Sequence, residues 1–576
     1  MYTNDYHRRT QTVFGIFIIF FLILIIRLLF IQFFHSEYLS KLAQKQHLQF
    51  VELEPRRGTI YDRNLNPLAV NINCDSLFAE PNQLLDKDKE KIIKQLSPIL
   101  NVQENFLRER LYRDKSFVWL ARKLNNVQSN AVRRLNLPGI NFIKESKRCY
   151  PNGYLASHVI GFAGLDNRGL EGLELYYDRY LRGEKGYTFF LRDARQKKLD
   201  LLAERMVSPK DGYDLILTID SIVQFIAERE LEKAVKENNA KGGSIIVMDP
   251  HTGEILALAN RPTYDLNEYT TATKDQIRNR AICDLFEPGS VFKIVTASVA
   301  LEENKMKEED RFFCENGAYK VASHTLHDHR PHGWLTFKEV VEQSSNIGVV
   351  KIAQVLGSQL LYKYIKIFGF GSKTGIDLSG EVSGIVKEPR LWSSISISVI
   401  PIGQEVAVTA LQLVNAISVI ANGGRLMRPY LVQEIRDRNS ETIKAFSPVM
   451  IRKVISLETA QRMRDILIGV VKEGTGKLAD LPDITVAGKT GTAQKIEPQG
   501  RYSYSRFMAS FIGFAPAHDP LIAIAVVIDE PHPYYFGGVV AAPVFKNVAI
   551  DVIRYLRSNQ PLRQAMALNI QKETQN

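Results

Sequence analysis

The sequence has few cysteines for its length, and their spacing excludes two kinds of small cross-linked domain. Its 576 residues include four of them, Cys74, Cys149, Cys283 and Cys314. Intervals of 75, 134 and 31 residues separate them, which fits neither a disulfide-rich scaffold nor a zinc finger. We expect unpaired, buried thiols, although the pattern itself leaves their disulfide state open.

Clustered positive charge is missing as well. The net charge of +11 comes from 74 basic and 63 acidic residues that are spread along the chain. A nucleic-acid-binding protein more often gathers Lys and Arg on one element, with aromatic residues between them. The sequence therefore predicts no nucleic-acid partner.

What is present is the composition of a globular protein, with 45% apolar and 24% charged residues. At 576 residues the chain is too long for one ordinary domain. Two folded domains and a membrane anchor are the expected organisation.

The anchor is the apolar run at residues 13–34, which contains a single charge, Arg27. It is long enough to span a bilayer, and the basic sequence at 7–9 favours a cytoplasmic N-terminus. No small-residue cleavage pattern follows at 35–38. We therefore predict a cytoplasmic tail at 1–12, one uncleaved helix in the inner (cytoplasmic) membrane, and a large periplasmic part. Arg27 fits a side chain that reaches the outer interface or a contact with another membrane helix.

The chain contains one Ser-x-x-Lys sequence, which runs from Ser290 to Lys293. A serine hydroxyl is a weak nucleophile, but a lysine one helical turn later can accept its proton if burial lowers the pKa of the amine. A turn at Glu287–Gly289 precedes an apolar helical run from Val291 to Leu301. This places Ser290 at a helix N-terminus, where backbone N–H groups favour an oxyanion. Taken alone, the motif also fits a solvated helix face.

Two further motifs follow in order. Ser344-Ser345-Asn346 is the only Ser-x-Asn in the chain, and Lys489-Thr490-Gly491-Thr492 supplies a Lys-Thr-Gly. Together with Ser-x-x-Lys they form the set found in penicillin-binding proteins and class A β-lactamases. Three ordered motifs indicate serine acyl transfer.

A second Lys-Thr-Gly begins at Lys373, inside a glycine-punctuated turn with no strand pattern before it. The copy at Lys489 follows a strand-like sequence at 484–488 and precedes a strand-rich segment at 507–528. An edge strand can pair with an extended peptide, which a loop does less well. We therefore assign the site to Lys489 and interpret Lys373 as part of a structural loop.

The whole sequence resembles class B penicillin-binding proteins of the division-specific, penicillin-binding protein 3 type. Besides the three motifs, the resemblance rests on segments Arg57–Asn64, Arg168–Glu174, Ile402–Glu405, Ala421–Gly424 and Gly537–Phe545. It covers nearly everything from the membrane segment to about residue 552.

The resemblance implies an α/β transpeptidase fold, in which an antiparallel sheet is flanked by helices and joined to an all-helical subdomain. We expect an elongated, mixed α/β, dimerisation-type pedestal at 35–212, the transpeptidase domain at 213–556, and a polar tail at 557–576. The predicted elements at the start of the transpeptidase domain are a strand at 215–218, a helix at 221–238 and strands at 243–248 and 254–259. An ion-pair network is expected to hold the pedestal to that domain, with Asp62, Arg63, Glu171 and Glu174 as its members.

Charges and geometry suggest how such a site would work. Ser290 would attack the carbonyl of a D-Ala-D-Ala stem peptide, with Lys293 as general base. Burial and the charge of Lys489 would lower the pKa of Lys293. The resemblance implies an oxyanion hole made by the N–H groups of Ser290 and Thr492, and a proton relay through Ser344 to the leaving D-alanine.

The resemblance also implies the binding roles. Asn346 would hold the amide of the donor peptide, and Lys489, Thr490, Gly491 and Thr492 would bind its terminal carboxylate, which β-lactams mimic. An amine of a neighbouring stem peptide would then resolve the ester and form a 4,3 cross-link at the division septum. No cofactor is expected. A polytopic glycosyltransferase and other divisome proteins are the implied partners.

Three other functions remain open. A β-lactamase or β-lactam sensor shares the acylation step, but we identify no glutamate placed to activate a deacylating water. An elongation-specific transpeptidase often carries Asp where this chain has Asn346. A catalytically silent scaffold would keep the fold without the reaction.

Two local features also allow more than one interpretation. His324, His327, His329 and His332 approach the density of a metal site, but their irregular spacing fits a polar loop near the cleft entrance. The segment 498–505, with two tyrosines, is a candidate for closing over substrate.

Overall fold

The computed structural model describes residues 3–36, 39, 48–115, 117–192, 198–199, 206–321, 324–497 and 499–573. The chain forms two compact units. The first combines residues up to Arg56 with residues 183–211, and the second combines residues 57–182 with residues 212–576. Residues 40–47, near the start of the predicted pedestal, lie outside the described residues.

The first unit contains the long N-terminal helix α1 (Thr3–Phe34) and a small sheet. Residues 8–34 of α1 are long and apolar enough to cross a membrane, and they are the one such helix among the described residues. In the sheet, β1 (Leu48–Leu53) pairs with β6 (Gly186–Arg192), which also pairs with β7 (Lys198–Leu199) and β8 (Met206–Val207).

A seven-stranded sheet forms the backbone of the second unit's N-terminal part. Its order is β20-β19-β9-β2-β3-β4, with β5 also paired to β3. The bounds are β2 (Ile60–Tyr61), β3 (Pro67–Ala79), β4 (Val118–Leu124), β5 (Ile140–Cys149), β9 (Asp214–Leu217), β19 (Val432–Arg436) and β20 (Thr442–Ala445). Because β9 pairs in parallel with β2 and antiparallel with β19, one sheet joins the pedestal to the part that follows it.

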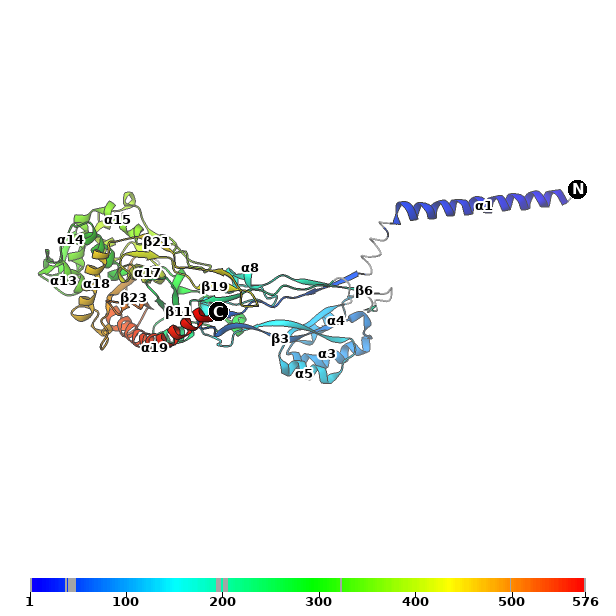
Figure 1. The fold of residues 1–576 in the computed structure, drawn as a ribbon, viewed down its shortest axis with the longest axis horizontal. Helices are drawn as coiled ribbons and strands as arrows, with labels where there is room; N and C mark the ends of the chain where they lie inside the picture. The colour runs from blue at the N-terminus through cyan, green and yellow to red at the C-terminus, as the bar shows by residue number, and fades with distance from the viewer. Residues whose placement is uncertain are drawn as a thin grey trace. The chain divides into compact units, whose positions relative to one another are not determined.

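Three helices pack beside one end of β3: α3 (Asp86–Leu100), α4 (Glu104–Leu111) and α5 (Asn126–Leu135) (Figure 1). They share a separate apolar core with β3, β4 and β5, in which Ile93 and Leu96 are fully buried. The helix α5 begins with a capping box between Asn125 and Gln128, which satisfies two backbone N–H groups.

The expected ion-pair network exists in a different form. Glu174 is fully buried and pairs with Arg57 at 2.5 Å and with Arg148 at 2.6 Å. Asp62 instead accepts hydrogen bonds from the backbone and hydroxyl of Ser221. The sequence pattern identified Glu174 but missed both arginines, because they lie 117 and 26 positions away.

One expected link does join the pedestal to the part of the chain that follows it. Arg63 pairs with Glu254 at 3.2 Å. Glu171 was predicted to belong to the same network, but its contact is a hydrogen bond from the backbone of its neighbour Gly172. Burial raises the pKa of its carboxyl group. The prediction was therefore wrong for Asp62 and Glu171.

The second sheet of this unit is five-stranded and antiparallel throughout, in the order β11-β10-β24-β23-β22. Its strands are β10 (Gly242–Met248), β11 (Ile255–Arg261), β22 (Ala487–Ile496), β23 (Tyr502–Ala515) and β24 (Ile522–Asp529). The predicted antiparallel sheet is confirmed. The strand β22 lies at its edge, as the assignment of the site to the Lys-Thr-Gly at Lys489 required.

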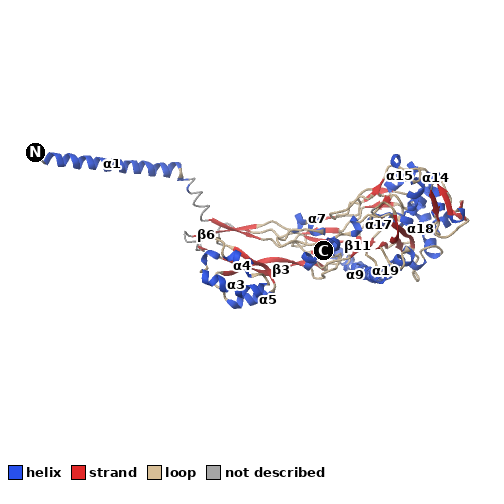
Figure 2. Cartoon of the chain, turned by 180° about the vertical axis from the view of Figure 1, so that it is seen from behind, coloured by secondary structure: helices blue, strands red, loops and turns tan. Residues whose placement is uncertain are grey.

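Side chains alternate between two cores on the faces of this sheet, as the two-residue period of strands requires. On one face lie α9 (Ser221–Glu237) and α19 (Gly537–Glu573), which Figure 2 shows near β11. On the other face lie α11 (Arg280–Cys283), α12 (Lys293–Glu302) and α17 (Ala410–Ala421). The helix α19 continues through the residues predicted as a polar tail.

The segment between β11 and β22 is mainly helical. Its remaining helices are α10 (Lys274–Ile277), α13 (Phe337–Glu342), α14 (Asn346–Leu356), α15 (Ser358–Ile367), α16 (Ser396–Val399) and α18 (Leu457–Lys472). Four two-stranded sheets add to the helices that the sequence predicted: β12 (Arg311–Phe313) with β15 (Trp334–Thr336), β13 (Ala318–Val321) with β14 (His324–His327), β16 (Ile385–Val386) with β17 (Val406–Ala407), and β18 (Arg425–Met427) with β21 (Met450–Lys453).

Three short helices complete the pedestal: α6 (Ser157–Ile160), α7 (Gly172–Tyr176) and α8 (Asp178–Leu181). All four cysteines are free thiols. Cys74 and Cys314 are buried, and Cys149 and Cys283 are half-buried.

Candidate active site

Ser290 lies in the tight 3₁₀ turn η3 (Gly289–Phe292), which leads directly into α12. The turn begins at Gly289, whose φ of +57° is one that glycine adopts without steric cost. A Cβ atom at Gly289 would stand 2.6 Å from the carbonyl oxygen of Thr492. The turn that holds Ser290 therefore lies directly against the edge strand β22.

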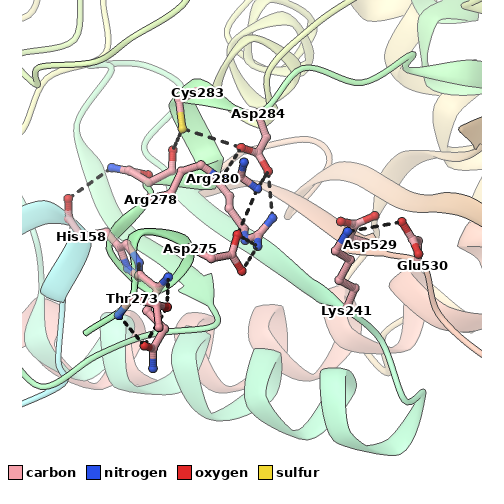
Figure 3. Close-up of polar contacts among 12 residues, drawn as sticks. His158, Lys241, Thr273, Asp275, Arg278, Arg280, Cys283, Asp284, Asp529 and Glu530 are labelled. Atoms are coloured by element: carbon pink, nitrogen blue, oxygen red, sulfur yellow. Dashed lines mark hydrogen bonds and ion pairs between the residues drawn. The ribbon is translucent and has the colours of Figure 1, made fainter. Parts of the chain in front are cut away.

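The chain just before this turn is held by polar contacts, most of them centred on Arg280 (Figure 3). Arg280 on α11 is almost fully buried and pairs with Asp275 at 2.8 Å and with Asp284 at 3.0 Å. The thiol of Cys283 donates to the carbonyl of Asn279 at 2.9 Å, and burial raises its pKa to about 11. These contacts fix the chain leading to Ser290 and keep the thiol in its unreactive form.

The pedestal also contributes a contact to the chain that leads to Ser290. His158 on α6 is buried, and its Nε2 atom contacts the carbonyl oxygen of Gln276 at 2.7 Å. Burial lowers the pKa of His158 to about 4, so the ring is neutral and serves as a hydrogen-bonding group.

Lys293 occupies the first turn of α12 and is fully buried. Its amine donates to the carbonyl oxygen of Ser344 at 2.5 Å, to the hydroxyl oxygen of Ser344 at 3.2 Å and to Oδ1 of Asn346 at 2.7 Å. None of these acceptors belongs to Ser290. Burial lowers the pKa of Lys293 to about 7, and the charge of Asp328 acts in the opposite direction. An amine with this pKa is available as a base near neutral pH.

Ser344 connects α13 to α14 and adopts a left-handed backbone conformation, with φ of +59°. Such a conformation is unfavourable for a residue with a side chain, and it persists only where the surroundings enforce it. Here it directs the hydroxyl between two amines, since Lys489 donates to the same oxygen at 2.9 Å. The second predicted motif therefore meets the first and the third at one oxygen atom.

Lys489 is fully buried on β22. Burial, and after it the positive charge of Lys293, hold the pKa of Lys489 well below its ordinary value. The sequence predicted repulsion between these two amines. The repulsion is present, but its effect is on Lys489 and not on Lys293.

The three residues after Lys489 continue along the edge strand and make different contacts. The hydroxyl groups of Thr490 and Thr475 lie 2.7 Å apart, and the hydroxyl oxygen of Thr492 accepts a hydrogen bond from the backbone of Gly537 at 3.0 Å. Gly491 lies between them where a Cβ atom would stand 2.4 Å from the Ser510 hydroxyl. The Thr492 hydroxyl accepts in this contact and still has one proton to donate.

The second Lys-Thr-Gly does not approach this group. Lys373 is exposed in the loop that follows α15, and Thr374 is tied to the carboxylate of Glu381 by its backbone and hydroxyl, each at 2.6 Å. The structure therefore places Lys373 in a loop, as we predicted because no strand pattern precedes it.

The histidine-rich segment has a different structure from the predicted polar loop. His324–His327 form the strand β14, and Asp328 follows it. Within the described ranges, no three His, Cys, Asp or Glu side chains are grouped to hold a metal ion. Asp328 instead contacts the N-terminus of α14, a position that the sequence did not reveal because the two segments are 18 residues apart.

Glu287 was also not singled out as a contact residue. It accepts a hydrogen bond from the Tyr502 hydroxyl at 3.2 Å and one from the backbone of Glu405 at 2.9 Å. This links the turn that holds Ser290 to the start of β23, where Tyr502 lies. In the predicted closing loop, Pro498 is outside the described residues and Tyr504 is 95% exposed.

Comparison with known proteins gives two family matches. Residues 243–549 match the penicillin binding protein transpeptidase domain, and residues 52–217 match the penicillin-binding protein dimerisation domain. These ranges contain the five-stranded sheet with all three motifs and the greater part of the seven-stranded sheet, respectively.

Among curated proteins, the chain is 40% identical over 555 residues to stage V sporulation protein D of Bacillus subtilis, covering 94% of this chain and 85% of that one. It is 32% identical over 534 residues to peptidoglycan D,D-transpeptidase FtsI of Escherichia coli, covering 92% and 88%. Among solved structures, penicillin binding protein 3 of Mycobacterium tuberculosis in complex with aztreonam has a TM-score of 0.69 at 28% identity, covering 88% of this chain and 98% of that one.

Proposed function

Because this chain belongs to the penicillin-binding protein transpeptidase family, with the dimerisation domain of its class B members, we propose that it cross-links peptidoglycan as a serine D,D-transpeptidase. The observation that carries the proposal is the meeting of Lys293, Ser344 and Lys489 beside the turn that holds Ser290. Two buried amines on either side of one hydroxyl provide a path along which a proton can move.

In the acylation step, the Ser290 hydroxyl loses its proton to the neutral amine of Lys293, and its oxygen attacks the carbonyl carbon of the penultimate D-alanine of a stem peptide. The hydrogen bond from the Ser290 hydroxyl to the Lys293 amine forms as the substrate binds, because catalytic hydrogen bonds often tighten only in the substrate complex. The backbone N–H groups of Ser290 and Thr492 receive the negative oxygen, which is commonly the largest contribution in acyl transfer.

The tetrahedral intermediate then loses the amino group of the terminal D-alanine. The carbon–nitrogen bond breaks, Ser344 passes a proton to the nitrogen, and D-alanine leaves while the ester on Ser290 remains. Ser344 recovers a proton from the amine of Lys293, to which it is already hydrogen-bonded. The amine of a second stem peptide attacks the ester in the reverse sequence, which frees Ser290 and forms the 4,3 cross-link.

Substrate binding uses the edge strand. The terminal carboxylate is bound by Thr490, Thr492 and Lys489, and its negative charge raises the pKa of Lys489 and favours the ammonium form. The peptide backbone pairs with the open edge of β22. Gly491 lets this strand lie close to the Ser510 hydroxyl. Asn346 keeps one amide hydrogen for the donor peptide, because its Oδ1 and its other hydrogen are used by Lys293 and the carbonyl of His327.

The proposed location follows from α1, which anchors the chain in the inner membrane with residues 1–12 in the cytoplasm and the catalytic part in the periplasm. We place the boundaries of the pedestal at 35–212 and of the transpeptidase domain at 213–556. The partners we propose are stem peptides, β-lactams, a polytopic glycosyltransferase and other division proteins. The relative named FtsI supports action at the septum.

The test uses the full-length protein in detergent with a fluorescent penicillin. The wild-type protein should acquire a label that persists for many minutes, and Ser290→Ala should acquire none, while Ser372→Ala, which lies in the loop with the second Lys-Thr-Gly, should label normally. Loss of the label within seconds would identify a β-lactamase instead. Cross-linking by Ser290→Ala would identify a scaffold.

The septal part of the proposal needs a separate test in cells. Depletion of the protein should give filaments, whereas round cells would indicate an elongation enzyme. Normal growth with defective spores would favour the role suggested by the relative named for stage V sporulation. Each of these outcomes leaves the acyl transfer chemistry intact.

A further inference from the structure

Asp328 lies between β14 and β15 and reaches the first turn of α14, the helix that begins with Asn346. One carboxylate oxygen accepts from the backbone of Asn346 at 2.5 Å and of Ile347 at 3.0 Å, and the other accepts from the Ser345 hydroxyl at 2.7 Å. The orphan N–H groups of a helix start are thus satisfied by an acidic side chain from a distant segment, which also suits the helix dipole.

The same segment holds the side chain of Asn346. The carbonyl oxygen of His327 accepts from Nδ2 of Asn346 at 2.8 Å. This contact fixes which way the amide faces, so that Oδ1 points to the amine of Lys293 at 2.7 Å. Asp328 and His327 therefore determine the position of Oδ1, the Asn346 group that accepts from the base.

We propose that Asp328 is a positioning residue for acylation, whose carboxylate holds the Ser344–Asn346 turn in register with the amine of Lys293. This inference rests on the proposed function. It assigns to the histidine-rich segment a role that its histidine side chains did not suggest, because the segment supplies a carboxylate and a backbone carbonyl.

The charge of Asp328 has a second effect. The charge that acts on Lys293 is that of Asp328 from the β14–β15 connection, while the nearby amine of Lys489 on β22 is itself shifted by Lys293. Around Asp328, the thiol of Cys314 is neutral because burial raises its pKa, and Lys351 of α14 is paired with Glu315 at 2.5 Å. Asp328 therefore favours the protonated form of Lys293, and its removal should let the base work at lower pH.

Two substitutions separate position from charge. In Asp328→Asn, the amide oxygen can still accept from the two backbone N–H groups while its NH₂ donates to Ser345. The Ser345 hydroxyl can then donate to Cys314, whose sulfur already lies 3.4 Å away. Asp328→Ala removes both the contacts and the charge. Asp437→Asn is the matched control, because Asp437 also accepts two backbone hydrogen bonds, in the β19–β20 hairpin.

The measurement is the acylation rate constant of the full-length protein with fluorescent penicillin between pH 5 and 9, together with thermal unfolding. At its optimum pH, Asp328→Asn should have an acylation rate constant within about fivefold of the wild-type value. The fall of the rate on the acid side of the profile, its acid limb, should move to lower pH. Asp328→Ala should lose about 10²-fold, as expected when a reacting group is misplaced by about 1 Å. Asp437→Asn should match the wild-type protein at every pH.

The inference is overturned if Asp328→Asn shows the wild-type pH profile, or if folded Asp328→Ala acylates within twofold of wild type. A loss of rate in Asp328→Asn with an unchanged acid limb would also overturn it, because that result marks a purely structural residue. If the wild-type protein itself is not acylated, the proposed function fails instead, so the two failures are distinguishable.

Discussion

The amine of Lys489 donates a hydrogen bond of 2.9 Å to the hydroxyl oxygen of Ser344, although 145 positions separate the two residues. Lys293 donates to the same oxygen at 3.2 Å. A proton on Ser344 therefore has a basic group on each side, one from a helix and one from an edge strand.

The first prediction concerns that contact. Lys489→Ala should slow acylation by about 10²- to 10³-fold, the loss typical of removing one preorganised donor from an acyl-transfer site. Lys373→Ala is the matched control, because it removes the lysine of the other Lys-Thr-Gly, which is exposed. Stopped-flow measurement with a fluorescent penicillin gives both rate constants. Equal losses in the two variants would contradict the assignment of Lys489.

The second prediction concerns pH. Burial lowers the pKa of Lys293 to about 7, and the neutral amine is the base. Acylation should therefore be constant above this pH and fall about tenfold for each unit below it, as a single protonation requires. The rate profile from pH 5 to 9 tests this directly. An acylation rate that still rises about tenfold per unit at pH 9 would mean that Lys293 keeps an ordinary pKa and does not act as the base near neutral pH.

The third prediction concerns stability of the pedestal. Glu174 is fully buried and pairs with Arg57 and Arg148, and Arg57 is also paired with Asp178 at 2.6 Å. Glu174→Gln should lower the free energy of unfolding by about 3–5 kcal/mol, because it leaves buried positive charge uncompensated. Glu109→Gln is the control, since Glu109 and its partner Arg113 are largely exposed. It should leave denaturant unfolding unchanged, and a similar effect in both variants would show that burial of the pair is unimportant.

The fourth prediction concerns the turn that holds Ser290. Gly289→Ala would place a Cβ atom 2.6 Å from the Thr492 carbonyl oxygen, and should therefore move Ser290 away from β22 and slow acylation at least tenfold. Gly380→Ala is matched in backbone strain, with φ of +86°, but a Cβ atom there meets nothing within 4 Å. It should lose about 1–2 kcal/mol of stability from its backbone conformation and keep its acylation rate. If both variants label alike, the contact with β22 is not what positions Ser290.

Much of the fold was predictable because it is encoded by local periodicity. The helix α9, the strands β10 and β11, and the strand entering Lys489 agree with the pattern of apolar residues. The strand β9 was also predicted, but its sheet was not, because its partners β2 and β19 lie far away in the sequence. Only pairing across the whole chain decides which sheet a short strand joins.

The candidate site divides in the same way. The sequence by itself determined the three motifs, their order and the preference for Lys489 over Lys373, because each depends on neighbouring residues. The tertiary structure decided that Ser344 lies between two amines, that Arg57 and Arg148 share Glu174, and that Asp328 caps α14. These contacts join segments between 18 and 145 positions apart, and they depend on packing geometry that no local pattern encodes.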